Sequence, residues 1–432
     1  MAVRPPPRSA DRGPRSTDLS LGAAVGVGIL IACVLGIPAA LMALSLAALV
    51  WVALFAARAI PAVGIHRLPV GIAQGMLVAI ALAGLSGVAV AAGLPSAVGT
   101  GPLLTAGGQA ESSTVGARTV TADDQVQHYD RLLLATGATP RRLALADESG
   151  AQVVYLRRIE DSDRLKEAFR PGLRLVVLGG GWIGLEVAAA ARASDVQVTV
   201  VEMAELPLLA VLGPEVAAVF ADLHREHGVD LRTGVQATRV EPSVVHLSDG
   251  TSVPADLLVV GVGVTPHTQL AETAGLAVDN GILVDASLRT SAAGVWAAGD
   301  VANAEHPLLG GRVRVEHWDN AIEQGRTAAH SMLGHQVSYD RLPYFFTDQY
   351  DLGMEYVGHV GRDGYDHVVV RGDTHRRVFT AFWLRGSRVL AGMHANDWDA
   401  IGPIRRLVGS TVEPNRLRDE SLSLDEVAEA TG

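Results

Sequence analysis

The pattern of apolar and polar residues divides this chain into two unlike parts. Residues 19–57 and residues 68–95 contain no charged side chain, whereas from residue 118 onward short apolar runs alternate with glycine-containing turns and helical stretches. About 20 apolar residues are enough for a helix to cross a bilayer. The first stretch therefore predicts two membrane helices and the second stretch one, while the rest predicts an α/β protein.

The basic residues of the N-terminal part predict how it is oriented. Four arginines precede residue 19, and Arg58 and Arg67 lie between the two apolar stretches. The positive-inside rule puts both groups in the cytoplasm. Three spans would carry the following part outside, whereas two spans, or a re-entrant last segment, would keep it inside. We expect residues 1–95 to be a transmembrane region of two or three helices, with the remainder on the cytoplasmic side.

The most informative pattern beyond the apolar region is residues 174–202. An apolar run leads into Gly179, Gly181 and Gly184, an alanine-rich helical stretch follows, and a second apolar run ends at Glu202. Such glycines let the backbone approach a pyrophosphate at a helix N-terminus. An acid at the end of the second strand binds the adenosine ribose hydroxyls and repels a 2′-phosphate. The pattern therefore predicts an NADH site rather than an NADPH site.

Two flanking segments, residues 129–142 and 294–302, are apolar strands that run into glycine. The apolar run of the first segment leads into Thr136 and Gly137, and that of the second leads into Gly299 and Asp300. At Gly299 there is room for a cofactor, and Asp300 has a carboxylate free to accept bonds from ribityl hydroxyls. A third strand-to-glycine run reaches Gly263, where the NAD-binding unit should close. Together these segments indicate a flavoprotein.

Two further segments are specific to one family: EHWDNAIEQG at residues 316–325 and PYFFTDQYDLGMEYVG at residues 343–358. With them the sequence resembles the FAD-dependent pyridine nucleotide reductases, most closely the ferredoxin and rubredoxin reductases of bacterial oxygenase systems. The resemblance implies an α/β fold in which a Rossmann-type NAD domain (151–280) is inserted in an FAD-binding domain (118–150 and 281–335). A C-terminal α+β interface domain (336–432) follows, and residues 96–117 are expected to be a linker.

The resemblance also implies roles for particular residues. Glu186 would lie near the nicotinamide, and the family usually has tryptophan where this chain has Phe346. The other candidate site residues are, for NAD, Gly179, Gly181, Gly184, Glu202 and Gly263, and, for FAD, Thr136, Gly137, Gly299, Asp300, Glu316, His317 and Trp318. Electrons would pass from NADH through FAD to an iron–sulfur acceptor such as a ferredoxin or rubredoxin-like protein.

Such reductases begin with a second glycine-rich βαβ unit, which holds the ADP half of FAD. The sequence before Arg118 contains no such pattern. Because a helix N-terminus normally neutralises the flavin pyrophosphate, we expect the chain to hold FAD weakly. The FAD-binding domain is therefore predicted to be partial.

Charge and cysteine content exclude several functions. The net charge is −11, with 6 basic and 2 acidic residues in 1–95 and 29 basic and 44 acidic residues in 96–432. An acidic domain argues against nucleic acid as a partner. The single cysteine, Cys33, excludes a dithiol relay and a cysteine-ligated cluster within the chain. No metal site is expected, and His224 and His227, three residues apart, are interpreted as part of a solvated helix face.

Two alternative functions stay open at this point. One is a membrane NADH:quinone reductase, and the other is a non-catalytic NADH-binding remnant fused to membrane helices, without usable flavin. Residues 35–49 also faintly resemble part of an arsenite or sodium–proton antiporter. Three helices are too few for a transport path, so no transport function is inferred.

Overall fold

The computed structural model describes residues 110–122, 125–360 and 364–431. The expected membrane segments, residues 19–57 and 68–95, and Cys33 lie outside these residues. Within the described ranges, no helix is both long enough and apolar enough to cross a bilayer. All described residues belong to one compact unit.

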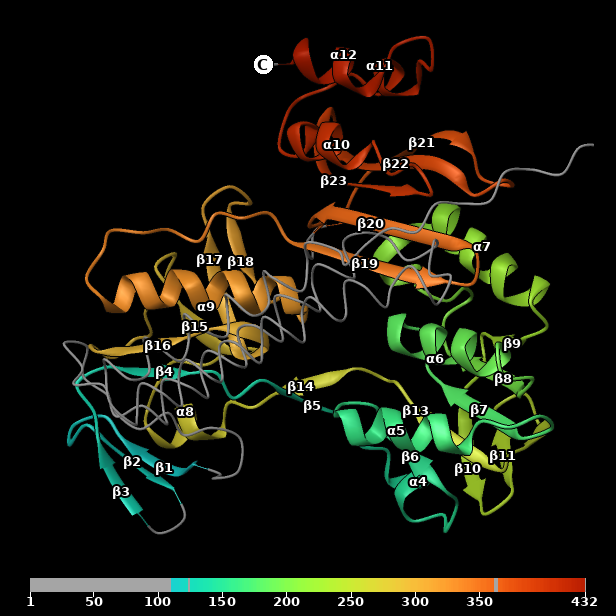
Figure 1. The fold of residues 1–432 in the computed structure, drawn as a ribbon, viewed down its shortest axis with the longest axis horizontal. Helices are drawn as coiled ribbons and strands as arrows, with labels where there is room; N and C mark the ends of the chain where they lie inside the picture. The colour runs from blue at the N-terminus through green and yellow to red at the C-terminus, as the bar shows by residue number, and fades with distance from the viewer. Residues whose placement is uncertain (1–109, 123–124, 361–363, 432) are drawn as a thin grey trace, which may run out of the picture. The chain divides into compact units, whose positions relative to one another are not determined.

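The centre of the expected NAD-binding region is a five-stranded parallel sheet (Figure 1). Its order is β6 (Val153–Val154), β13 (Leu257–Val260), β7 (Arg174–Leu178), β8 (Gln197–Glu202) and β9 (Asp230–Thr233). Its helices are α4 (Ala144–Asp147), α5 (Ile159–Ala168), α6 (Trp182–Arg192) and α7 (Leu209–Glu226). A small antiparallel sheet is formed by β10 (Ala237–Glu241), β11 (Val244–Leu247) and β12 (Ser252–Pro254).

Both faces of the parallel sheet are covered, which explains why its strands are apolar at almost every position. Leu175 and Val177 of β7 belong to the core cluster that includes α5, α6 and α7. Val176 and Leu178 point to the other face, where the core contains residues of β10 to β12. Ala146 of α4 belongs to this second core, so the region includes a residue before its expected start at 151.

On the flavin side, the described residues form four small sheets, which extend beyond the expected ranges 118–150 and 281–335. Their strands are β1 (Ala110–Thr114), β2 (Thr119–Ala122), β3 (Gln125–His128), β4 (Leu132–Leu134), β5 (Ala138–Pro140), β14 (Val264–Pro266), β15 (Ile282–Val284), β16 (Val295–Ala297), β17 (Ala302–His306) and β18 (Gly311–Val313). The helical elements are α8 (Gln269–Thr273), the short 3-10 helix η2 (Gly299–Val301) and α9 (Trp318–Met332). The key pair is β4 and β16, which run parallel with Leu132 opposite Val295.

The expected linker 96–117 is corrected at its C-terminal end. Residues 110–114 form β1, which pairs antiparallel with β2, with Thr114 opposite Thr119. Ser and Thr in this segment suggested flexibility, but β-branched threonines also suit a strand when a partner strand is available. The outer boundary of the NAD region differs too, because Ala271 of α8 packs in the flavin-side core rather than in the NAD-side core.

The C-terminal region, expected to be an α+β interface domain, contains a five-stranded antiparallel sheet. Its order is β19 (Tyr344–Gln349), β20 (Leu352–Gly358), β23 (Arg388–Ala395), β22 (Val378–Arg385) and β21 (His367–Asp373). The helices are α10 (Ile401–Leu407), α11 (Pro414–Arg418) and α12 (Leu424–Glu429).

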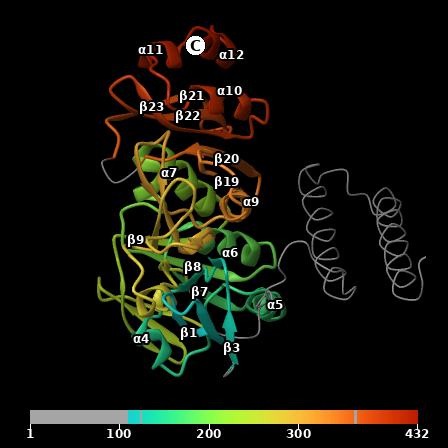
Figure 2. The same cartoon turned by 90° about the vertical axis from the view of Figure 1, so that its left-hand side faces the viewer.

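This sheet lies between two groups of helices. One face packs on α10 to α12, with Phe382 and Ile404 in a common core. The other face shares a core with α6 and α7, and Trp383 donates a hydrogen bond from Nε1 to the Leu212 carbonyl at 3.1 Å. Figure 2, turned by 90° from Figure 1, shows β20 next to α7 again. The C-terminal sheet is therefore packed directly onto the helices of the expected NAD-binding region.

Candidate nucleotide-binding site

The turn between β7 and α6 has the geometry of a dinucleotide-binding loop. Gly179 has φ +107°, and a Cβ there would lie 2.4 Å from the Gly261 carbonyl oxygen. A Cβ on Gly184 would lie 2.1 Å from the Gly179 carbonyl oxygen. Both positions therefore require glycine, because the strand, the turn and the helix approach one another too closely for any side chain.

Gly181 differs from these two glycines. It is the N-cap residue of α6, and a Cβ placed on it would meet no atom of the described residues within 4 Å. Packing within the chain therefore does not explain a glycine here, whereas close approach of a ligand to the backbone does. The three glycines thus fit the roles they have in pyrophosphate binding, and α6 presents its free N–H groups at the same place.

Glu202 lies at the end of β8, beside this turn. Its Oε2 accepts a hydrogen bond from the Gly180 N–H at 2.6 Å, and its Oε1 accepts one from the Ala204 N–H at 2.8 Å. The carboxylate is therefore fixed in place by the loop itself. A carboxylate has about four acceptor positions, so two remain for ribose hydroxyls.

The candidate flavin residues come together at the carboxyl ends of β4 and β16. Because the two strands are parallel neighbours, the segments that follow them, Thr136–Gly137 and Gly299–Asp300, emerge at the same edge. Arg157 joins them, since its Nη2 lies 2.8 Å from Asp300 Oδ2 and would be 3.2 Å from a Cβ on Gly137. The structure adds a partner for the Asp300 carboxylate and leaves its other acceptor positions for ribityl hydroxyls. Asp300 forms an ion pair with Arg157, whose role the sequence did not reveal.

Helix α9 is held against the same edge. The Gly299 N–H donates to Gln324 Oε1 at 2.8 Å, and Arg314 donates from Nη1 to the Asp300 carbonyl at 3.2 Å. The same Nη1 lies 2.5 Å from Glu316 Oε1. Arg314 Nε is buried and has no hydrogen-bond partner in the described part of the chain. Together, these side chains provide charged and polar groups that suit the hydroxyl-rich ribityl part of a flavin.

His317 and Trp318 begin α9. His317 accepts a hydrogen bond at Nδ1 from the Asp319 N–H at 3.3 Å, and burial lowers the pKa of its imidazole, which favours the neutral ring. Trp318 is 55% exposed, and its ring lies 6.3 Å from that of Phe346. An exposed tryptophan beside a phenylalanine gives the apolar surface that a flavin ring needs. These residues therefore fit the ring and ribityl end of FAD.

For the ADP half of FAD, the described part of the chain contains no second loop of this kind. In residues 110–122, 125–360 and 364–431, the glycine-rich turn that opens a helix occurs once, at Gly179–Gly184.

Gly263 lies where the chain returns from the NAD-binding sheet. It has φ +100°, and its carbonyl accepts a hydrogen bond from the Arg141 N–H at 2.9 Å. Nearby, Thr136 donates from Oγ1 to the His267 carbonyl at 2.7 Å. The pairing of β5 with β14 thus places Thr136 and Gly263 on the connection between the two regions.

Glu186 and β19 link the two halves of the site. Glu186 lies in α6, two residues after Gly184, and its Oε1 accepts a hydrogen bond from Thr347 Oγ1 at 2.5 Å. Burial raises the pKa of Glu186. The preceding residue, Phe346, contacts Trp318 at the start of α9. Adjacent positions of β19 therefore contact the NAD-side helix and the flavin-side helix, and Thr347 is a site residue that the sequence analysis missed.

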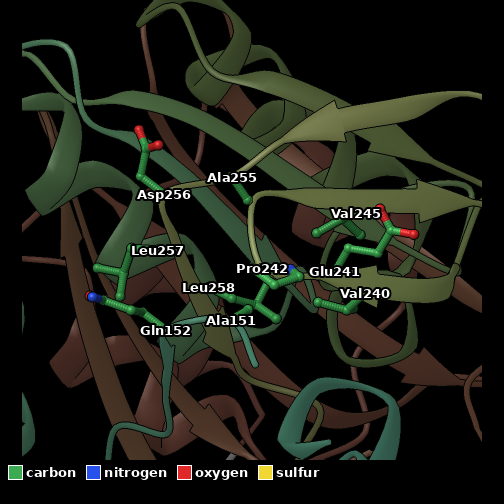
Figure 3. Close-up of a pocket in the computed structure, with 10 residues that line it drawn as sticks. All are labelled: Ala151, Gln152, Val240, Glu241, Pro242, Val245, Ala255, Asp256, Leu257 and Leu258. Atoms are coloured by element: carbon green, nitrogen blue, oxygen red, sulfur yellow. The ribbon is translucent and has the colours of Figure 1, made fainter. Parts of the chain in front are cut away.

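Two surface hollows lie elsewhere. The crevice in Figure 3 is too narrow to admit a water molecule, and it is lined by Ala151, Gln152, β10, β11 and the start of β13. A second hollow of about 480 Å³ lies by the β17–β18 hairpin, around His306 and Arg312. Neither is lined by a candidate nucleotide-binding residue, so neither changes the assignment.

Comparison with known proteins agrees with this geometry. The family model described as pyridine nucleotide-disulphide oxidoreductase matches residues 101–325, and the model described as reductase C-terminal matches residues 344–428. Neither family is a transporter, so the faint resemblance of residues 35–49 to an antiporter gains no support.

Similar proteins include putidaredoxin reductase of Pseudomonas putida, 40% identical over 325 residues, which are 72% of this chain and 76% of the relative. The ferredoxin–NAD(+) reductase component of the anthranilate 1,2-dioxygenase system of Burkholderia cepacia is 40% identical over 68% of this chain and 74% of its own length. The structure resembles the covalent putidaredoxin reductase–putidaredoxin complex, with a TM-score of 0.71 and 37% identity over 75% of this chain and 80% of that one. The chain therefore belongs to the pyridine nucleotide-disulphide oxidoreductase family and is an FAD-dependent NAD(P)H oxidoreductase of the ferredoxin reductase type.

Proposed function

We propose that this protein takes electrons from NADH and delivers them, through FAD, to a small iron–sulfur protein of the ferredoxin or rubredoxin kind. The observation that carries the proposal is the course of β19, in which Phe346 contacts Trp318 and Thr347 contacts Glu186. One strand thereby contacts both the helix of the proposed NADH site and the helix of the proposed flavin site. This supports the proposal, because hydride transfer needs the two reacting rings to be held close together.

NADH would be held by the loop and helix that follow β7. Gly179 and Gly184 shape the turn, Gly181 leaves space for the pyrophosphate, and the N-terminus of α6 stabilises its charge. Glu202 would bind the ribose hydroxyls and exclude a 2′-phosphate. Gly263 would line the nucleotide where the chain leaves β13.

FAD would be held by the residues gathered at β4, β16 and α9. Asp300, fixed by Arg157, and the adjacent glycines Gly137 and Gly299 would face the ribityl chain, with Thr136 beside them. Glu316, His317 and Trp318 would line the ring. When bound, FAD supplies the redox chemistry, accepting a hydride from NADH and giving up electrons one at a time. The side chains orient the cofactor and exclude water.

The acceptor is inferred from two facts. Several relatives are named as ferredoxin–NAD(+) reductase components of dioxygenase systems, and one similar structure is a complex with putidaredoxin. In addition, a single cysteine in the sequence leaves no dithiol to relay electrons within the chain. Electrons must then pass directly from the flavin to a separate protein.

A visible spectrum of the purified full-length chain, followed by NADH addition without oxygen, tests this proposal. Bound FAD absorbs at about 450 nm and bleaches on reduction. We expect NADH-dependent bleaching after FAD has been supplied, and reoxidation by ferredoxin that is faster than reoxidation by quinone. Preferential reoxidation by quinone would instead favour a membrane NADH:quinone reductase. A chain that binds NADH but never FAD would be a non-catalytic remnant.

For residues 1–95 we propose membrane attachment, with the reductase portion on the cytoplasmic side. The support comes from the sequence alone: two long uncharged stretches, and arginines grouped before and between them. NADH is a cytoplasmic substrate, so this orientation agrees with the proposed reaction.

A further inference from the structure

Five side chains form a continuous hydrogen-bonded chain where the C-terminal sheet packs on the helices of the NAD region. It runs from Tyr350 Oη to His224 Nδ1 (3.4 Å), from His224 Nε2 to Gln349 Oε1 (2.8 Å), from Gln349 Nε2 to Thr347 Oγ1 (3.1 Å) and from Thr347 Oγ1 to Glu186 Oε1 (2.5 Å). This row of hydrogen bonds thus begins near the C-terminal end of α7 and ends in α6, beside the nucleotide-binding loop.

With Glu186 ionised and His224 neutral, the direction of every hydrogen bond in this row of side chains follows from its donor and acceptor groups. An ionised carboxylate only accepts, so Thr347 donates to Glu186. The amide nitrogen of Gln349 only donates, so it donates to Thr347, and its amide oxygen must accept from His224 Nε2. A neutral His224 ring then has Nδ1 as an acceptor for the Tyr350 hydroxyl. All four donors therefore point toward Glu186.

The middle of this hydrogen-bonded row is buried. His224 and Gln349 are fully buried, and Thr347 is 2% exposed. Burial also lowers the pKa of His224, which favours the neutral ring that the chain requires. A buried imidazole with its proton fixed on one nitrogen contradicts the solvated helix face expected for His224 from the sequence. Buried polar networks are costly unless every group in them is satisfied, and a satisfied network fixes the positions of its side chains.

Opposing influences act on Glu186. Burial raises its pKa, the hydrogen bond from Thr347 lowers it, and the nearby Asp348 carboxylate raises it. At the other end of the chain, His227 stacks on Tyr350 with ring centroids 3.8 Å apart, and Arg192 acts on Tyr350 electrostatically. The Thr347 hydroxyl is thus the one contact among these that favours the charged form of Glu186.

We propose that Thr347, Gln349 and His224 form a positioning relay that fixes the orientation and the charge of the Glu186 carboxylate. The inference rests on the proposed function, in which Glu186 lies by the nicotinamide. The oxidised nicotinamide ring carries a positive charge and the reduced ring carries none. An ionised Glu186 therefore favours NAD+ over NADH, and the relay sets how strongly the site distinguishes the two.

The first test measures the titration of Glu186 directly. Infrared difference spectra of the full-length chain against Glu186→Gln, recorded over a pH series, follow the carboxyl band without any nucleotide. In Thr347→Val the titration should move to higher pH, because the donor to the carboxylate is lost. In Gln349→Met it should move the same way by less. Thr380→Val, a buried threonine of β22 without a hydrogen-bond partner in the described part of the chain, is the matched control and should not move it.

The double variant distinguishes a relay from a general packing effect. If Gln349 acts through Thr347, Gln349→Met should have no further effect in the Thr347→Val background. An equal shift in both backgrounds, or no shift in Thr347→Val alone, would overturn the proposal. Nitrogen-15 NMR of histidine-labelled protein should in addition find His224 protonated at Nε2, and should find that preference lost in Gln349→Met.

Nucleotide affinity separates this inference from the proposed function. At neutral pH the preference for NAD+ over NADH should fall about two- to tenfold in Thr347→Val, corresponding to one hydrogen bond. An infrared shift without any change in this preference would mean that Glu186 lies away from the nicotinamide. The relay to Glu186 would then be supported, but its proposed effect on the choice between NAD+ and NADH would be wrong. A chain that binds no NADH would contradict the proposed function and leave the infrared result to decide the relay.

Discussion

At the scale of single residues, the glycines of the β7–α6 turn have separable roles. Gly184→Ala would put a Cβ 2.1 Å from the Gly179 carbonyl oxygen. We expect this change to lower the free energy of unfolding by about 1–3 kcal/mol, the usual cost of overpacking. The new Cβ of Gly181→Ala meets no atom of the described residues, so this change should cost less stability than Gly184→Ala while it weakens NADH binding. Thermal unfolding and nucleotide titration of the two variants check this, and a stable Gly184→Ala would contradict the tight contact.

We expect Glu202 to determine the choice between NADH and NADPH, and its hydrogen bonds in the structure suggest how to test this. NADH should bind more tightly than NADPH to the parent chain, and Glu202→Ala should narrow the difference, because the acid no longer repels the 2′-phosphate. The same change removes the acceptor for the Gly180 and Ala204 N–H groups, so the loop itself is disturbed. Glu202→Gln is therefore the control, since it removes the charge and retains an acceptor. Equal affinities of the parent chain for the two nucleotides would reject the assignment.

At the scale of elements, an ion pair joins the starts of β7 and β13. Asp256 accepts hydrogen bonds from the Arg174 N–H at 2.9 Å and from Arg174 Nε at 3.0 Å. Its pKa is lowered to about 2 by these bonds from Arg174. A carboxyl whose pKa is depressed in the folded state stabilises the fold at higher pH, and this contribution is lost as the pH falls through about 4 toward 2.

Asp256→Asn should therefore be less stable than the parent chain at pH 7 and equally stable near pH 2. Both side chains are more than a third exposed, so the difference at pH 7 should be no more than about 1 kcal/mol. Urea unfolding at several pH values measures it. A difference that does not change with pH would mean that the carboxylate charge is not what stabilises this contact.

Elements were predictable from the sequence where all the residues that define them lie close together in the chain. The βαβ pattern around Gly179–Glu202 was predictable because the turn, the helix N-terminus and the terminal acid lie within one short segment. Arg157 and Thr347 were not predictable, because each acquires its role from a residue far away in the sequence: Asp300 for Arg157 and Glu186 for Thr347. His224 was misinterpreted for the same reason, since its burial depends on a strand more than 100 residues later.

At the scale of the whole molecule, the described regions depend on one another through shared cores. The C-terminal sheet contributes Trp383 and Phe379 to the same core as Leu212 and Phe220 of α7. The sequence predicted separate regions with boundaries at residues 280 and 335. It did not predict that residues from different regions pack in one core. A change that weakens the C-terminal sheet should accordingly disturb the NAD-binding helices as well.

The last prediction concerns residues 1–95, for which we propose membrane attachment. Uncharged stretches as long as 19–57 and 68–95 are stable only in lipid or deep in a core. We therefore expect the full chain to stay in the membrane fraction after carbonate washing, which releases proteins held by charge alone. A chain that begins at Ser96 should move to the supernatant under the same conditions and serves as the control. Recovery of the full chain in the supernatant without detergent would contradict membrane attachment. The proposed NADH chemistry would be unaffected, because its residues all lie beyond the apolar region.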